Sequence, residues 1–152
     1  MTADAEHITN WQRLDARTTT SGRLVADDVS ALAAIGVRHV INLAPDGEGN
    51  GSLSGEAELL AEQGIRYSYI PVPFLAPEES QFETFCRAFE ADDEPVHVHC
   101  IANWRVSAFF YRYNRDVRGM DEPAARALME RQWSPETGDY AHIWGPFIAP
   151  GN

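Results

Sequence analysis

The chain has 152 residues, 44% of them hydrophobic and 23% charged, which is the size and composition of a globular domain that buries its own core. Its 12 basic and 23 acidic residues give a formal net charge of -11, which argues against nucleic acid or an anionic membrane as the main partner. No apolar run approaches roughly 18 residues, so insertion into a membrane is not expected.

The N-terminal half alternates predicted strands with predicted helices. Residues 7–15 are expected to form a short strand and residues 18–23, "TTTSGR", a turn. A helix is predicted from about Asp27 to Ile35, because acidic residues favour its start and Gly36 is a natural end. The segments 37–43 and 65–72 have the composition of strands. Between them, a loop at 44–54 precedes a helix that ends at Gly64.

The C-terminal half continues the alternation. A helix is expected over residues 77–91, with an apolar stripe formed by Phe82, Phe85, Cys86 and Phe89. Residues 95–99 are predicted as a strand, the segment after Cys100 as a helix, and residues 121–132 as another helix. The tail is expected to add a short helix around Trp144 and Phe147. This alternation predicts an α/β fold of three layers, with a mainly parallel sheet flanked by helices. Residues 1–152 are expected to form a single domain.

One stretch, "VHVHCIANWRVS" (96–107), combines groups that carry chemistry. A strand, a tight loop and a helix aim backbone N–H groups at an anion, and the helix N-terminus stabilises the thiolate of Cys100. Arg105 can clamp two phosphate oxygens in a fork, and the Ser107 hydroxyl can donate to the sulfur. These are the parts of nucleophilic displacement at phosphorus through a phosphocysteine. The structural alternative is a buried cysteine at a strand end beside a surface arginine.

Segments outside this loop add to the pattern. "TTTSGRL", "GVRHVINLAPDGE", "GIRYSYIPVPF", "VHVHC" and "NWRVSAFFYRY" span roughly residues 18–115. Their order and spacing resemble those of the bacterial tyrosine-phosphatase-like proteins of the cysteine-dependent, dual-specificity phosphatase superfamily. The resemblance implies a cysteine-phosphatase-like fold with Cys100 as the nucleophile, Arg105 as the phosphate clamp and Ser107 as a helper in hydrolysis. His99 would support the loop and favour the thiolate instead of acting as a base.

The spacing of the loop departs from that superfamily, whose pattern has five residues between the cysteine and the arginine. Here four residues intervene, and with Arg105 they would surround the phosphate: Ile101, Ala102, Asn103 and Trp104. Ala102 and Ser107 keep their usual offsets, so the arginine is shifted by one step within a normal loop, or one residue is deleted. Asn103 replaces a usual glycine, and asparagine tolerates left-handed backbone.

The same four-residue spacing leaves other functions open. It occurs in many rhodanese-type sulfurtransferases and in another phosphatase-like bacterial group related to beta-lactamase-fold fusions. Sulfur transfer through a Cys100 persulfide is therefore one alternative. A catalytically silent domain that binds phosphorylated partners is another.

The general acid that would protonate the leaving oxygen is not identified by the sequence. Asp46 follows a predicted strand, in a Pro-Asp-Gly turn, and is the candidate from the preceding loop. Glu78 and Glu79 precede the cysteine strand, but they are explained equally well as first-turn residues of a helix.

The remaining polar residues are assigned structural roles. His97 and His99 alternate along a strand and share a face, but without an acidic cluster they are a weak metal signal, and no metal or cofactor is predicted. Cys86 is expected in the core, and Arg112 and Arg115 on a solvated helix face.

Partners and compartment follow from the same observations. Two cysteines are too few for a disulfide framework, and the N-terminus lacks the basic start and apolar block of a secretory signal. We expect a cytoplasmic protein that acts on a phosphorylated small molecule or protein. The substrate and the oligomeric state are left open.

Overall fold

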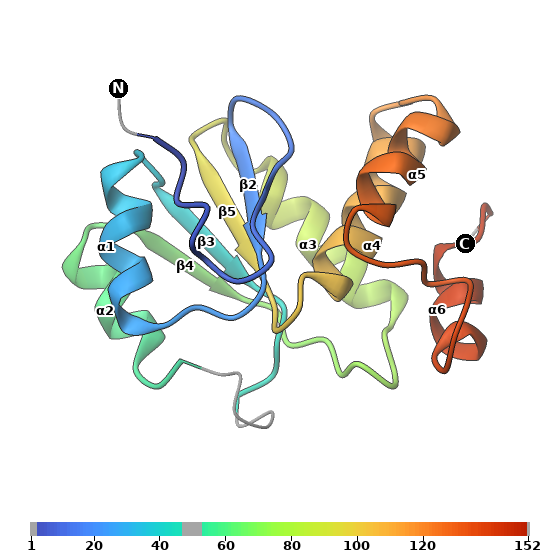
Figure 1. The fold of residues 1–152 in the computed structure, drawn as a ribbon, viewed down its shortest axis with the longest axis horizontal. Helices are drawn as coiled ribbons and strands as arrows, with labels where there is room; N and C mark the ends of the chain where they lie inside the picture. Colours follow the sequence, from blue (N-terminus) through green and yellow to red (C-terminus); the bar gives the residue numbers. More distant parts are fainter. Residues whose placement is uncertain (1–2, 47–52, 152) are drawn as a thin grey trace.

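The computed structural model of the chain describes residues 3–46 and 53–151, and a five-stranded sheet runs through its centre (Figure 1). The strands are β1 (Gln12–Arg13), β2 (Thr18–Ser21), β3 (His39–Asn42), β4 (Arg66–Tyr69) and β5 (Val96–His99), in the spatial order β1-β2-β5-β3-β4. Strand β1 is antiparallel to β2, and all other pairs are parallel. The mainly parallel sheet predicted from the sequence is confirmed.

Helices cover both faces of the sheet (Figure 1). They are α1 (Ala26–Ala34), α2 (Glu56–Glu62), α3 (Glu79–Glu90), α4 (Trp104–Arg112), α5 (Glu122–Glu130) and α6 (Ala141–Ile148), with a π-helical turn, η1 (Tyr113–Val117), after α4. Helices α1 and α2 bury one face, and α3 and α4 the other; α5 and α6 pack against α4. The three-layer α/β fold is thus confirmed. In the described ranges, no helix has the length and apolar character to cross a membrane.

Strand β5 lies in the middle of the sheet and is buried on both faces. Val96 and Val98 point into the cluster under α3 and α4, because side chains alternate along a strand. His97 and His99 therefore face the opposite side, and their rings stack with centroids 6.3 Å apart. The predicted shared face of the two histidines is confirmed.

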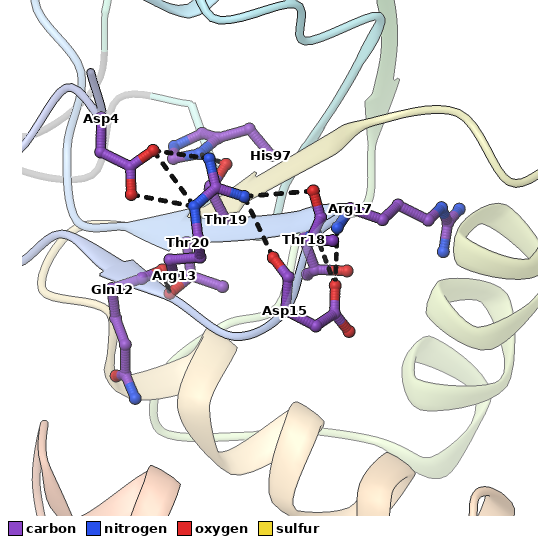
Figure 2. A network of polar contacts seen from close by, with 10 residues as sticks. Asp4, Gln12, Arg13, Asp15, Arg17, Thr18, Thr19, Thr20 and His97 are labelled. Carbon is purple, nitrogen blue, oxygen red and sulfur yellow. Dashed lines mark hydrogen bonds and ion pairs between the residues drawn. The ribbon is translucent and has the colours of Figure 1, made fainter. Parts of the chain in front are cut away.

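The N-terminal region differs from its prediction. Residues 18–23 were expected to turn, but Thr18–Ser21 form β2, whose four side chains are all buried. Two of its threonine hydroxyl groups find partners on the neighbouring strands: Thr19 Oγ1 lies 2.9 Å from His97 Nδ1, and Thr20 Oγ1 donates to the Gln12 carbonyl at 3.0 Å (Figure 2). Only Gln12–Arg13 of the expected 7–15 strand is extended.

Arginines on α4 and η1 also differ from their prediction. Arg112 is only 1% exposed, with its guanidinium 4.0 Å from the Phe82 ring centroid, and it donates to both carboxylate oxygens of Glu79 at 2.9 and 2.8 Å. Arg115 has a side chain 9% exposed and donates to the Ile148 carbonyl. The expected solvated face was wrong, because α3 and α6 cover it.

Candidate active site

The cysteine loop lies at the carboxyl end of the central strand. Cys100 directly follows β5 and is 1% exposed, and α4 begins at Trp104. Asn103 caps the helix with φ 65°, a left-handed conformation that asparagine tolerates, as the sequence indicated. Its side-chain amide donates to the Asn10 carbonyl at 2.8 Å and to Thr20 Oγ1 at 3.0 Å. Asn103 thereby fixes the loop to β2 and to the N-terminal segment.

The backbone carbonyl groups and N–H groups of this loop differ in their hydrogen bonding. The carbonyls of Ile101, Ala102, Asn103 and Trp104 accept hydrogen bonds from Arg23 N, Asn10 Nδ2, Ser107 N and Trp133 Nε1, at 2.9, 2.9, 3.0 and 2.9 Å. The N–H groups of Ile101, Ala102 and Asn103 donate to no protein acceptor within the described ranges. Three successive donors therefore stand unpaired at the start of α4, an arrangement that binds anions.

Arg105 is the second residue of α4 and is 3% exposed. Its Nη1 donates to the Val72 carbonyl at 2.8 Å, and its guanidinium lies 5.6 Å from the Phe74 ring centroid. These contacts aim the side chain toward the segment after β4. Despite its unusual spacing, Arg105 lies beside Cys100 in the lining of one pocket.

This pocket has a volume of about 180 Å³ and is lined by Phe74, Cys100, Ile101, Ala102, Trp104, Arg105 and Tyr140. Its walls are mostly aromatic: Phe74 and Tyr140 meet edge to face with centroids 4.8 Å apart, and Trp104 stacks on Trp133 at 4.6 Å with planes 3° apart. The pocket therefore combines a thiol and a cation with apolar walls.

Ser107 lies away from this pocket. Its hydroxyl donates to the Trp104 carbonyl at 3.1 Å, one turn back along α4. It lines a small internal cavity on the other side of the helix, together with Gln12, Thr20 and Asn103. In this arrangement the hydroxyl proton is already used within the helix, and the structure does not bring Ser107 together with the pocket residues.

A buried carboxylate that the sequence analysis missed supports His99. Glu56, in the first turn of α2, lies 2.6 Å from His99 Nε2, and the two side chains are 6% and 4% exposed. On the other edge of the ring, His99 Nδ1 is 3.3 Å from the Cys100 carbonyl. Glutamate is common in the first turn of a helix because it interacts favourably with the helix dipole, so nothing in the sequence distinguished Glu56.

The candidate acids occupy different environments. Asp46 is exposed just beyond the carboxyl end of β3, and its backbone N–H donates to the Tyr69 hydroxyl at 2.7 Å. Glu79 is engaged with Arg112, and the Glu78 N–H donates to Gln81 Oε1 at 2.8 Å at the start of α3. The two glutamates thus have the helix-start roles that the sequence also allowed.

The side chains of Cys86 and His97 make their contacts outside the pocket. Burial raises the pKa of the Cys86 thiol to about 11, as expected for a side chain packed against the core. Both ring nitrogens of His97 meet hydroxyl groups, those of Thr19 and Ser21, at 2.9 and 2.8 Å. In the part of the chain that the structure describes, no cluster of three or more histidine, cysteine or acidic side chains could hold a metal ion.

Sequence comparisons indicate the relatives of this chain. Residues 12–112 match the family model described as "Beta-lactamase hydrolase-like protein, phosphatase-like domain". The beta-lactamase hydrolase-like protein of Xylella fastidiosa is 32% identical over 135 residues, 78% of this chain and 31% of the relative. That of Agrobacterium fabrum is 29% identical over 136 residues, 79% of this chain and 32% of the relative. The chain therefore spans about a third of the length of these curated relatives.

Solved structures share the fold. A putative phosphatase from Shewanella putrefaciens CN-32 has a TM-score of 0.80 and 29% identity, covering 93% of this chain and 87% of that one. TpbA of P. aeruginosa, solved with pTyr, has a TM-score of 0.72 and 20% identity, covering 93% and 83%. The PP-IP phosphatase SIW14 of S. cerevisiae has a TM-score of 0.72 and 14% identity, covering 93% and 84%. The last two likenesses show the fold alone.

Proposed function

Because the chain belongs to the phosphatase-like domain family of the beta-lactamase hydrolase-like proteins, we propose that it hydrolyses phosphate monoesters through a covalent intermediate on Cys100. The observation that carries the proposal is the row of unpaired N–H groups between Cys100 and α4, whose carbonyls all accept hydrogen bonds from the protein. Such a row favours three phosphate oxygens over a neutral ligand. Arg105, held by the Val72 carbonyl, supplies the positive charge.

The reaction proceeds in two displacements. The Cys100 thiolate attacks phosphorus, the bond from phosphorus to the ester oxygen breaks, and the leaving alcohol takes a proton from a general acid. Water then attacks the phosphocysteine and gives a proton to the same group, now a base. The sulfur–phosphorus bond breaks, and the thiolate and inorganic phosphate result.

We assign the acid to Asp46. Strand β3 pairs with β5 in parallel, and Asn42 lies beside His99 in that register. The segments that follow the two strands therefore begin at the same end of the sheet, where the strands have their carboxyl ends. The bond from the Asp46 N–H to the Tyr69 hydroxyl holds the start of its loop there. Its exposed carboxyl can exchange protons with solvent.

The walls of the pocket favour an aryl ester such as phosphotyrosine, free or in a protein. Phe74, Trp104 and Tyr140 offer ring faces and edges around the thiol, and an aromatic leaving group gains about 0.5–1.5 kcal/mol from one such contact. TpbA, which shares the fold, was solved with pTyr. A reducing cytoplasm would keep Cys100 in the thiol state that the reaction needs.

The test uses the full chain and its Cys100→Ser variant, with Cys86→Ser as the matched control. Phosphate release from p-nitrophenyl phosphate and from phosphotyrosine should disappear with Cys100→Ser and persist with Cys86→Ser. Equal release by both variants would contradict the proposal. Thiocyanate formation from thiosulfate and cyanide, without phosphate release, would replace it with sulfur transfer. Phosphate binding without either turnover would indicate a catalytically silent domain.

A further inference from the structure

The pair formed by Glu56 and His99 lies directly behind the nucleophile. His99 precedes Cys100 in the chain, and its ring is buried between β5 and the first turn of α2. The distance of 2.6 Å between His99 Nε2 and Glu56 Oε2 is that of a strong, charge-assisted hydrogen bond. A carboxylate enclosed in this way needs a partner that carries a proton.

The contacts of the ring indicate how many protons it carries. A neutral imidazole has one N–H and one acceptor nitrogen. His99 faces an acceptor at each nitrogen, the Glu56 carboxylate at Nε2 and the Cys100 carbonyl at Nδ1, 3.3 Å away. While the Glu56 carboxylate is ionised, only the doubly protonated ring donates to both.

The neighbouring His97 offers a direct contrast. The Ser21 hydroxyl donates to the Gly22 carbonyl, so it accepts from His97 Nε2, while the Thr19 hydroxyl can donate to Nδ1. One N–H satisfies this ring, and full burial holds the pKa of His97 well below its ordinary value of 6.5. The two stacked histidines on one strand therefore have different partners, a carboxylate at one ring and hydroxyl groups at the other.

We propose that Glu56 is a positioning residue that keeps His99 as an imidazolium ion, oriented toward the Cys100 carbonyl, so that a fixed cation stabilises the Cys100 thiolate. The inference deepens the proposed function, since both need that thiolate. A buried cation without a counter-charge is unfavourable, so removal of the carboxylate should leave His99 neutral and withdraw the stabilisation from the sulfur.

The other titratable groups around the pair do not replace Glu56. His97 faces the ring from the same strand and is neutral, as its low pKa requires. Tyr67, on β4, interacts with Glu56, and burial raises the pKa of its phenol, so it stays uncharged near neutral pH. Among the described residues, Glu56 carries the one carboxylate bonded to this ring.

The experiment measures alkylation of Cys100 by iodoacetamide from pH 4 to pH 9, resolved by mass spectrometry. Glu56→Gln removes the charge at constant shape, and Glu58→Gln, exposed on the same helix, is the matched control. We expect the midpoint of the Cys100 titration to rise by about one pH unit in Glu56→Gln, which lowers the rate at acidic pH about tenfold. Glu58→Gln should match the wild type. An unchanged midpoint in a folded Glu56→Gln variant would overturn the proposal.

A double-mutant cycle and a measurement on the unaltered chain separate charge from folding. In a His99→Asn background, Glu56→Gln should cause no further shift; a shift that persists there would exclude action through the ring. In the wild type, ¹⁵N NMR should find both His99 nitrogens protonated at pH 7, and one unprotonated nitrogen would refute the inference. Neither readout requires turnover, so failure of the phosphatase proposal would be seen separately.

Discussion

Gly22 determines how closely the cysteine loop approaches the end of β2. A Cβ atom at this position would lie 2.5 Å from the Ile101 carbonyl oxygen and 3.2 Å from the Ala102 Cα. The next residue, Arg23, donates its N–H to that same carbonyl at 2.9 Å. Because both obstructing atoms are backbone, no side-chain rotation can make room. The glycine in "TTTSGRL" is therefore explained by contact with the loop.

Gly22→Ala should displace the loop and lower the free energy of unfolding by about 1–3 kcal/mol, as overpacking does elsewhere. Phosphatase turnover should fall further than stability accounts for, because the N–H groups of the loop lose their alignment. Gly145→Ala is the control, since its added Cβ would have no neighbour nearer than 4.0 Å. Denaturant unfolding and steady-state kinetics measure both effects, and wild-type values for Gly22→Ala would contradict the steric explanation.

His97 makes stability depend on pH. Its pKa is lowered by burial, so the unfolded chain gains a proton at this residue as the pH falls below about 6.5 while the folded chain does not. Proton uptake by the unfolded state stabilises it, so folding is weakened on acidification and is at full strength above that pH.

Between pH 6.5 and pH 5, the free energy of unfolding should fall with a contribution from His97 of at most about 1.4 kcal/mol per pH unit, the value for one proton. His97→Gln should remove that contribution from the slope. His142→Gln, whose ring is exposed on α6, should leave the slope unchanged. Equilibrium denaturation at several pH values provides the slopes, and equal slopes for His97→Gln and the wild type would refute a neutral buried ring.

Single residues also show where sequence reasoning stops. Cys100, Arg105 and Asn103 were singled out because their neighbours in the chain carry the pattern, and the structure places all three in or beside the cysteine loop. Glu56 precedes Cys100 by many residues, and only the pairing of sheet and helix brings it to His99. A contact between two distant segments produces no periodic pattern in the sequence of either segment.

At the scale of elements, the burial of side chains on α4 depends on the helices packed against it as well as on its own sequence. Arginines stand among aromatic residues in α4 and in the turn after it, and these arginines were predicted to lie on a solvated face. Helix α6 covers that face, and Arg112 is enclosed between the rings of Phe82 and Phe147, with centroids 4.0 and 4.9 Å from its guanidinium. The sequence of α4 alone does not reveal that a helix much later in the chain packs over this face.

Arg112→Ala should lower the free energy of unfolding by about 2–4 kcal/mol, because it removes buried packing and the paired hydrogen bonds to Glu79. Arg87→Ala, at an exposed position of α3, should change it by no more than about 0.5 kcal/mol. Thermal and urea unfolding of the two variants measure the difference. Similar values for both would mean that the enclosed arginine contributes nothing to folding.

Strand β2 was mistaken for a turn for a related reason. Serine and glycine near its end have turn composition, whereas its three threonines are β-branched residues that fit a strand, and neighbouring strands satisfy the hydroxyl groups of Thr19 and Thr20. The partners of Thr19 and Thr20 come from β5 and β1, as Figure 2 shows. The longer helices and central strands were predictable because their apolar pattern is local.

At the scale of the whole molecule, the residues that match the family model do not include every residue that lines the pocket. The match covers residues 12–112, whereas Trp133 and Tyr140 come from the C-terminal part of the chain. The thiol and the cation thus belong to the part that the family model matches, and one wall of the pocket lies outside that part. We therefore expect substrate preference to vary more among relatives than the chemistry does.

Tyr140→Ala should lower kcat/KM for an aryl phosphate about threefold to tenfold, the equivalent of one lost aromatic contact. Hydrolysis of a small alkyl phosphate should be almost unaffected, since such a leaving group has no aromatic ring to pack against Tyr140. Phe147→Ala, outside the pocket lining, tests for indirect effects of repacking. Equal losses on both substrates would show that Tyr140 supports the structure and does not select the leaving group.

The stacked indoles of Trp104 and Trp133 have an optical consequence. With centroids 4.6 Å apart and planes 3° from parallel, the two chromophores couple their electronic transitions. Trp104 also lines the pocket, so a ligand that enters it alters the environment of one member of the pair. The chain therefore carries its own spectroscopic reporter, and an exciton band in circular dichroism or a change in fluorescence can follow occupancy of the pocket without any added label.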